Sequence, residues 1–229
     1  MIKLVVFDWN GTLFADVQAS FEVTNRILEH HGKKQISMKK YRETITFPLF
    51  DFYLKNGYEH KELTDVSKAL QSFYHKHYEI RASKSRARKG AKKLLKWLKQ
   101  NKLKTVILSN HTVAGIHYRL KLLGLDEFVL DVLANPNVHV VFNRTSKRDR
   151  LEDYLRSNKY AKSEVIIVGD STEEAEIGKQ LGIKSVAITD GFYSVKRLKR
   201  ARPDFLIRNL ANIKDVIKSN GITAGKKKH

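Results

Sequence analysis

The feature that most constrains this chain is a series of short β-branched runs separated by segments with helical periodicity. Clear runs occupy residues 3–7, 105–108, 165–168 and 185–188, and weaker ones occupy residues 138–142 and 205–207. Such apolar runs are typical of buried strands. The helical segments between them lie at residues 89–100, 112–123, 147–158, 172–181 and 209–219. This alternation predicts an α/β fold, a doubly wound parallel sheet with helices on both faces.

The strand signal is absent from residues 15–87, where helical segments occupy residues 17–30, 38–44, 48–55 and 62–80. We therefore predict an all-helical insert at residues 15–87, called the helical insert below, within an α/β core made of residues 1–14 and 88–229. Because the insert follows the first strand, it should lie over the carboxyl ends of the strands, where open α/β sheets bind ligands. We expect the basic tail, residues 225–229, to be frayed.

Composition excludes several classes of protein. The chain has 229 residues and no cysteine, which excludes disulfide scaffolds, thiolate nucleophiles and zinc sites that need sulfur. The 41% of apolar residues is enough for a folded core. The chain runs from Met1 into an apolar strand without a signal-peptide pattern or a membrane-length apolar run, so we expect a cytoplasmic protein without membrane insertion.

Carboxylates follow two of the clear strands. Asp8 begins the segment Asp-Trp-Asn-Gly-Thr after the first strand, and Asp170 follows the strand at residues 165–168, with Glu173 and Glu174 one helical turn later. Either aspartate alone could be only a helix N-cap or a turn former. Together, at the carboxyl ends of parallel strands, they could converge on one hard cation, which prefers oxygen ligands.

Other residues at the same predicted edge could bind a phosphoryl group. Ser109 and Asn110 follow the second strand, although a Ser-Asn pair there is more often a cap. Lys147 begins the helix before the Asp170 strand, although a lysine in so basic a chain is more often a solvated surface residue.

These residues, in this order, resemble the four motifs of the haloacid dehalogenase superfamily of phosphohydrolases. The matches are residues 8–12, Ser109, Lys147 and residues 169–174. The resemblance covers nearly the whole chain, because the helical insert looks like the family's small C1 cap. Residues 189–206 are also similar to the end of phosphoglycolate-phosphatase-like members.

The resemblance implies phosphoryl transfer through a covalent aspartyl phosphate, with Asp8 as the nucleophile. It implies Mg²⁺ held by the Asp8 carboxylate, the main-chain carbonyl of Asn10 and Asp170, with Glu174 or Glu173 in support. The phosphate-binding residues would be Asp8, Gly11, Thr12, Ser109, Asn110 and Lys147, and the substrate a small phosphorylated metabolite.

Asn10 departs from the family pattern, which usually has a second aspartate as the acid/base at this position. That aspartate gives a proton to the leaving group and later takes one from water, and a carboxamide can do neither. General acid-base catalysis typically raises the reaction rate by about 10² to 10⁴-fold. The loss is smallest when the leaving group is a weak base, as in aryl phosphates, acyl phosphates and phosphoanhydrides. The Asn10 main-chain carbonyl is retained, so metal binding should survive.

The formal charge of +20, from 44 Lys and Arg against 24 Asp and Glu, biases the surface toward anionic partners. Residues 81–125 hold 13 of these basic residues and no acidic one. This surface is either a solvated face or a site for nucleic acid or another polyanion. The basic surface leaves open a nucleotide or polynucleotide phosphatase as an alternative. Asn10 leaves open a second alternative, a binding or scaffold protein that has lost useful turnover.

Overall fold

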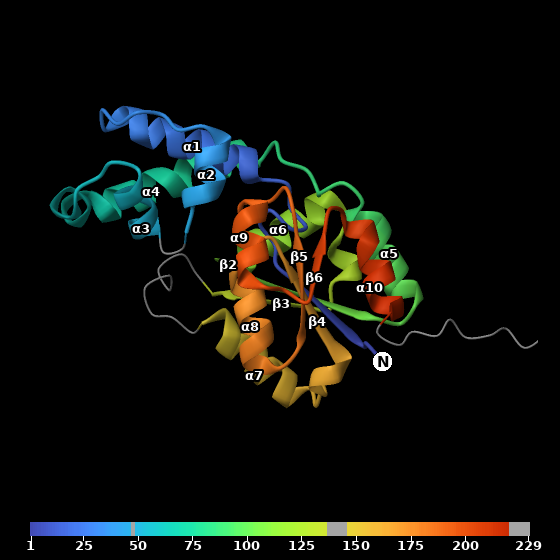
Figure 1. Ribbon diagram of the computed structural model, residues 1–229. Coiled ribbons are helices and arrows are strands. Elements are labelled where there is room, and N and C mark those ends of the chain that lie inside the picture. Colours follow the sequence, from blue (N-terminus) through green and yellow to red (C-terminus); the bar gives the residue numbers. More distant parts are fainter. Residues whose placement is uncertain (47–48, 137–145, 220–229) are drawn as a thin grey trace, which may run out of the picture.

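The computed structural model describes residues 1–46, 49–136 and 146–219. Within them one parallel sheet has the strand order β3-β2-β1-β4-β5-β6 (Figure 1). The strands are β1 (Leu4–Phe7), β2 (Lys104–Thr112), β3 (Asp131–Asn135), β4 (Val165–Gly169), β5 (Lys184–Ile188) and β6 (Phe205–Ile207). The chain moves outward from β1 to β3 and then returns to β4 on the other side of β1. The predicted doubly wound parallel sheet is confirmed.

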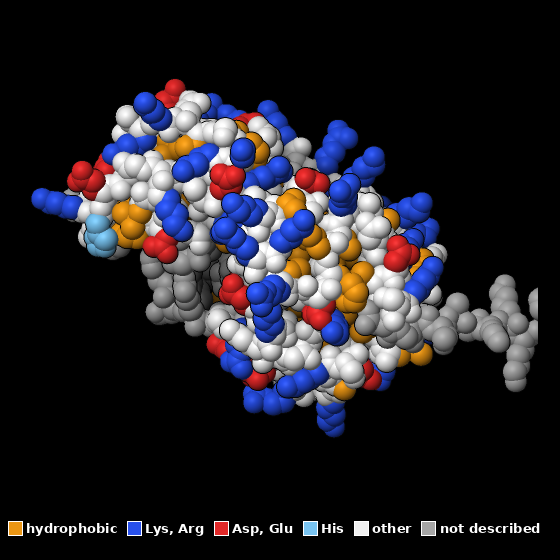
Figure 2. Space-filling view, in the orientation of Figure 1, with side chains coloured by type: hydrophobic (Ala, Val, Ile, Leu, Met, Phe, Trp, Pro, Cys, Tyr) orange, Lys and Arg blue, Asp and Glu red, His pale blue; other side chains and the backbone are white. Residues whose placement is uncertain are grey.

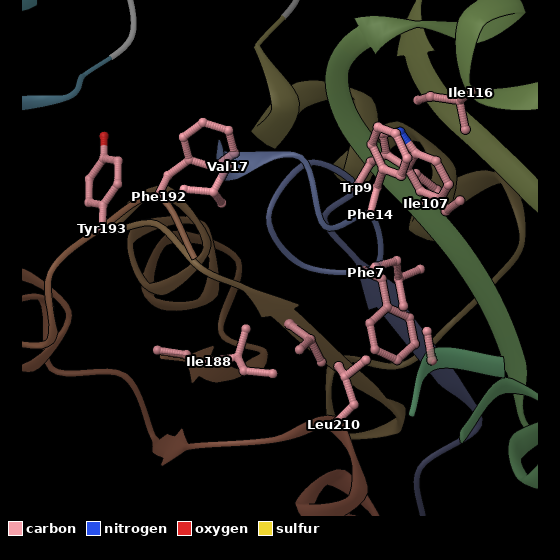
Figure 3. Packing of buried hydrophobic residues seen from close by; sticks show 14 of the residues in the cluster. Phe7, Trp9, Phe14, Val17, Ile107, Ile116, Ile188, Phe192, Tyr193 and Leu210 are labelled. Carbon is pink, nitrogen blue, oxygen red and sulfur yellow. The ribbon is translucent and has the colours of Figure 1, made fainter. Parts of the chain in front are cut away.

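Strand β1 is buried on both faces, because helices cover both faces of the sheet. Val5 and Phe7 pack in one apolar cluster, and Leu4 and Val6 pack in another on the opposite face. The first cluster includes core residues of α5 (Ala91–Gln100), α6 (Val113–Leu123) and α10 (Ile213–Ser219), and the second includes residues of α7 (Lys147–Ser157) and α8 (Glu173–Leu181). Figure 3 shows Phe7 beside Leu210, which begins the short helix η4 (Leu210–Asn212).

One strand and one α-helix of the core were not predicted. The third strand is Asp131–Asn135, whereas the predicted strand at residues 138–142 lies outside the described residues, as does the predicted frayed tail at 225–229. Helix α9 (Val195–Ala201) also lacks a sequence signal, since it is mostly basic and buries only Leu198. The short helices η1 (Asp126–Phe128) and η3 (Lys162–Glu164) complete the described core.

Strand β2 is longer than predicted. The sequence pattern ends it at residue 108, but the strand continues to Thr112, with a shift of register against β3 after Leu108. Ser109 and Asn110 therefore lie inside this irregular end of the strand rather than after it. An irregularity of this kind re-aims side chains locally.

The helical insert contains α1 (Val17–His30), α2 (Met38–Thr44), α3 (Leu49–Lys55) and α4 (His60–Ala82), close to the predicted segments. Figure 1 shows these helices grouped to one side of the sheet. The two chain segments that join insert and core run side by side, because Phe14 forms an antiparallel bridge with Ala87. Backbone hydrogen bonds from Ala15 to Arg86 (2.9 Å) and from Arg88 to Leu13 (2.8 Å) flank that bridge.

Basic side chains are spread widely over the surface and lie over both the insert and the core in Figure 2. In α5, Ala91, Leu94, Leu95 and Leu98 are buried, as the amphipathic pattern predicts, and the lysines of that helix are exposed. Among the described residues, no helix combines the length and apolar character needed to cross a membrane.

Candidate active site

The loop after β1 places Asp8 and Asn10 at the carboxyl edge of the sheet. The loop is closed by backbone hydrogen bonds from Leu13 and Phe14 to the Trp9 carbonyl, both 3.0 Å, and the Trp9 and Phe14 rings stack (Figure 3). Gly11 has a φ of +73°, and a Cβ atom there would lie 2.3 Å from Asp170 Oδ2. Only glycine allows this loop to approach Asp170 so closely.

Lys147 joins carboxylates from two different loops. Its ammonium donates to Asp8 Oδ1 at 2.7 Å and to Glu174 Oε1 at 2.9 Å, and lies 3.2 Å from Glu173 Oε2. Burial alone would lower the pKa of Lys147, but Asp8, Glu174 and Glu173 outweigh it and raise that pKa. A charged ammonium therefore lies beside the Asp8 carboxylate, where it could contact a phosphoryl oxygen.

Asp170 lies close enough to Asp8 to affect its charge state. Its Oδ1 accepts a hydrogen bond from the Thr12 hydroxyl (2.9 Å), and its Oδ2 accepts one from the Phe192 main-chain N–H (2.5 Å). Burial raises the pKa of Asp170 to about 6, and Glu174 adds to the rise. Burial also raises the pKa of Asp8, with Lys147 opposing this effect and Glu174 and Asp170 reinforcing it. The two aspartates are thus close enough to influence each other electrostatically.

This charge balance suits a hard divalent cation. Asp8, Asp170 and Glu174 are buried carboxylates, and the one buried ammonium among them, that of Lys147, contacts only Asp8 and Glu174 of the three, so negative charge is in excess. Over residues 1–46, 49–136 and 146–219, no three His, Cys, Asp or Glu side chains converge as a ready metal site. The predicted ligand set needs only the Asp8 and Asp170 carboxylates and one main-chain carbonyl, while the Glu174 carboxylate is occupied by Lys147 and Ser171.

Ser109 and Asn110 lie next to this cluster. Ser109 is buried, and its Oγ accepts a hydrogen bond from the His111 main-chain N–H (3.1 Å), which leaves the Ser109 hydroxyl hydrogen able to donate elsewhere. The Asn110 amide donates to Glu173 (3.4 Å), the acid that also contacts Lys147. Asn110 is therefore connected through Glu173 to the cluster around Lys147, and Ser109 precedes Asn110 in β2.

Arg150, which the sequence analysis did not single out, holds this segment in place. Its guanidinium donates to the Ser109 carbonyl (3.0 Å), to Asn110 Oδ1 (3.2 Å) and to Asn135 Oδ1 (2.6 Å). Asn135 in turn donates to the Asn110 carbonyl (2.7 Å). Lys147 and Arg150 lie one turn apart on α7. This helix therefore contacts both Asp8, through Lys147, and the end of β2, through Arg150. No local pattern distinguishes Arg150 from the other basic residues.

Asn10 turns its side chain toward the helical insert. Its Nδ2 donates to Asp16 Oδ2 and lies within hydrogen-bond distance of the Tyr78 hydroxyl, both at 2.8 Å. Asp16 also accepts hydrogen bonds from the Gly11 N–H (2.8 Å) and from the Tyr78 hydroxyl (2.5 Å). Asp16 and Tyr78 are further residues that the sequence analysis missed. The only sequence signal was that Asp16 directly precedes a helix.

The insert contacts the core on both sides of the site. On one side, Glu79 of α4 accepts from Arg119 (3.0 Å), with His111 Nε2 3.3 Å away. On the other side, Arg42 of α2 donates to the Gly191 carbonyl (2.9 Å), and Arg197 of α9 donates to the Ile45 carbonyl (2.6 Å). These contacts place the insert directly against the carboxyl edge of the sheet.

Comparison with known proteins agrees with this geometry. The profile of the haloacid dehalogenase-like hydrolase family matches residues 5–188, a span that includes Asp8, Ser109, Lys147 and Asp170. The chain belongs to the haloacid dehalogenase-like hydrolases. This finding confirms the predicted family and the prediction of a hydrolase.

Curated relatives of this hydrolase match almost end to end. A pyrophosphatase PpaX from Halalkalibacterium halodurans is 24% identical over 217 residues, covering 94% of this chain and 97% of the relative. A phosphoglycolate phosphatase from Synechococcus elongatus is 23% identical over 223 residues, covering 93% and 95%. A haloacid dehalogenase-like protein of Streptococcus pneumoniae has the same fold, with a TM-score of 0.79 at 18% identity, covering 94% of this chain and 98% of that one.

Proposed function

We propose that this hydrolase is a Mg²⁺-dependent phosphatase that acts on a small phosphorylated metabolite through an aspartyl-phosphate intermediate at Asp8. The observation that carries the proposal is the buried contact of Asp8 with Lys147, next to Asp170 and under the helical insert. A carboxylate at the end of a parallel strand, with a fixed cation beside it, suits in-line attack on phosphorus.

Each step has a residue to perform it. Asp8 would attack phosphorus through the carboxylate oxygen that does not contact Lys147, while the leaving oxygen departs. Lys147 and the Ser109 hydroxyl would bind the equatorial oxygens, and such preorganised donors are usually the largest catalytic contribution. Arg150 would keep Ser109 and Asn110 in place. Water then hydrolyses the acyl phosphate.

The metal would be held by the Asp8 and Asp170 carboxylates and the Asn10 main-chain carbonyl, with Glu174 in support. Bound Mg²⁺ would neutralise phosphoryl charge and orient the phosphate. The hydrogen bonds to Asp170 from Thr12 and Phe192 would keep that carboxylate in one orientation.

The helical insert would act as a cap, and residues 14–15 and 87–88 as its paired hinge segments. Contacts through Tyr78, Glu79 and Arg42 would form when the cap closes over substrate and excludes water. Because Asn10 has no proton to give, weakly basic leaving groups should be favoured over alkyl alcohols. The pyrophosphatase named among the relatives cleaves a bond of this kind, which supports that preference.

The test is release of p-nitrophenol from p-nitrophenyl phosphate with and without Mg²⁺, in the parent protein and in Asp8→Asn. The proposal expects metal-dependent release that Asp8→Asn abolishes. Metal-independent release, or release that survives Asp8→Asn, would contradict it. Folded, Mg²⁺-binding protein with no release from any ester would instead favour the binding or scaffold alternative.

The nucleotide or polynucleotide alternative depends on the basic surface alone. Turnover of a polymeric substrate that falls steeply with salt, while turnover of p-nitrophenyl phosphate does not, would favour it.

A further inference from the structure

Two polar groups converge on Asn10, the side chain that departs from the family pattern. Asn10 comes from the loop after β1, Asp16 from the start of the helical insert, and Tyr78 from the fourth helix of that insert. Asp16 is fully buried, and Tyr78 is 6% exposed. Polar groups buried this deeply must hydrogen-bond to one another, because water does not reach them freely.

The donors and acceptors in this group match only when residue 10 is an amide. The Asp16 carboxylate accepts from the Gly11 N–H, the Tyr78 hydroxyl and Asn10 Nδ2. Aspartate in place of Asn10 would bring a second carboxylate to within about 3 Å of the first and remove one of those donors. Asn10 and Asp16 therefore form a matched pair of donor and acceptor.

The pairing also fixes the orientation of the amide. Since Asp16 needs a donor, Nδ2 must face it, and the Oδ1 oxygen must point the other way. Asn10 is partly exposed, and its Oδ1 accepts no hydrogen bond from the part of the chain that the structure describes. That oxygen is therefore available to a water molecule or to a hydroxyl of the substrate.

We propose that Asp16 and the insert residue Tyr78 are positioning residues that lock the Asn10 carboxamide with its oxygen toward the reaction centre. Asn10 then orients the attacking water as a hydrogen-bond acceptor without taking its proton. The bond between phosphorus and the Asp8 carboxylate breaks as this water attacks, and both hydrogens of the water leave on the dihydrogen phosphate product. Tyr78 reaches Asn10 only from the insert, so closure of the insert completes the arrangement. This role in orienting water depends on the proposed phosphatase function, whereas the pairing of Asn10 with Asp16 does not.

The pairing is tested by a double-mutant cycle read by thermal unfolding without substrate. Asn10→Asp and Asp16→Asn should each lower the unfolding midpoint by roughly 3–10 °C, because each breaks the match. The double variant Asn10→Asp/Asp16→Asn exchanges donor and acceptor and should recover at least half of the combined loss. Additive losses, or an Asn10→Asp variant as stable as the parent, would overturn the pairing.

The positioning role is tested by steady-state kinetics with p-nitrophenyl phosphate. Tyr78→Phe removes one hydroxyl and should lower kcat by roughly ten- to a hundredfold with little change in KM. Tyr58→Phe is the matched control, because the Tyr58 hydroxyl is buried in the same insert and has no partner among the described residues. A Tyr78→Phe variant that changes KM alone, or that behaves like Tyr58→Phe, would overturn the role.

The two measurements separate the possible failures. Recovery of stability in the double variant together with an inactive parent would refute the proposed function and leave the pairing intact. An active parent without recovery would refute the pairing and leave the proposed function intact.

Discussion

Replacement of Lys147 by methionine should be the most informative single change in the core. The lysine is 5% exposed and contacts Asp8 and Glu174 at 2.7 and 2.9 Å, so methionine would leave two buried carboxylates without their cation. Removing one partner of a buried ion pair typically costs about 3–5 kcal/mol. For a chain of this size, each kcal/mol shifts the unfolding midpoint by about 2–4 °C, so we expect a fall of about 6–20 °C.

The loss should depend on pH in a defined direction. Without Lys147, the folded-state pKa values of Asp8 and Glu174 rise above the unfolded values of about 4. A carboxyl group whose pKa is raised by folding stabilises the fold less as pH rises through that pKa. The deficit relative to the parent should therefore be largest near pH 8 and shrink toward pH 4.

The assay is thermal unfolding of the parent and of Lys147→Met from pH 4 to pH 8, with chelator present to remove metal. Lys96→Met, on the exposed face of α5, is the control and should change the midpoint by no more than about 2 °C. A Lys147→Met variant with an unchanged midpoint, or with a deficit that grows toward acid pH, would refute the reasoning.

Three further changes test other parts of the site. Gly11→Ala should cost about 1 kcal/mol or more of unfolding free energy and most of the phosphatase activity, because its Cβ would meet Asp170 at 2.3 Å; a normal unfolding midpoint and rate would contradict this. Arg150→Met should lower kcat/KM for p-nitrophenyl phosphate about tenfold or more, since one hydrogen bond to a charged group is worth about 1.5–3 kcal/mol, whereas the surface variant Arg148→Met should not. The hydrogen bond to His111 helps to lower the pKa of Glu79 to about 2. The ionised Glu79 carboxylate therefore stabilises the fold above about pH 4.5, and this stabilisation is lost as pH falls toward 2. Glu79→Gln should remove this acid-dependent loss of stability from unfolding curves recorded between about pH 5 and 3.

The sequence predicted the central strands well because they are buried on both faces. β1, β4 and β5 read as short runs rich in apolar and β-branched residues, and their one exposed position, Lys184, stands at the start of β5. The edge strand Asp131–Asn135 contains Asp131 and Asn135 among its five residues, so its pattern is weak. The seven-residue helix Val195–Ala201 buries one leucine and is too short and too basic to show a helical period.

The candidate site was predictable where a residue follows a strand or begins a helix. Asp8, Asp170 and Lys147 hold such positions, and the structure brings them together. Tyr78 and Arg150 reach the site from the interior of helices, through contacts that span 68 and 41 residues of sequence. A periodicity argument cannot identify contacts of that range, because they depend on how the insert and α7 pack against the sheet.

The most direct test of the proposed chemistry is to look for the phosphoenzyme. Parent protein mixed with Mg²⁺ and p-nitrophenyl phosphate, quenched in acid and digested, should yield a peptide containing Asp8 that carries one additional phosphoryl group. Borohydride should reduce that acyl phosphate, and Asp8→Asn should give neither product. Phosphorylation at another residue, or rapid turnover with no label on Asp8 at any quench time, would contradict the account.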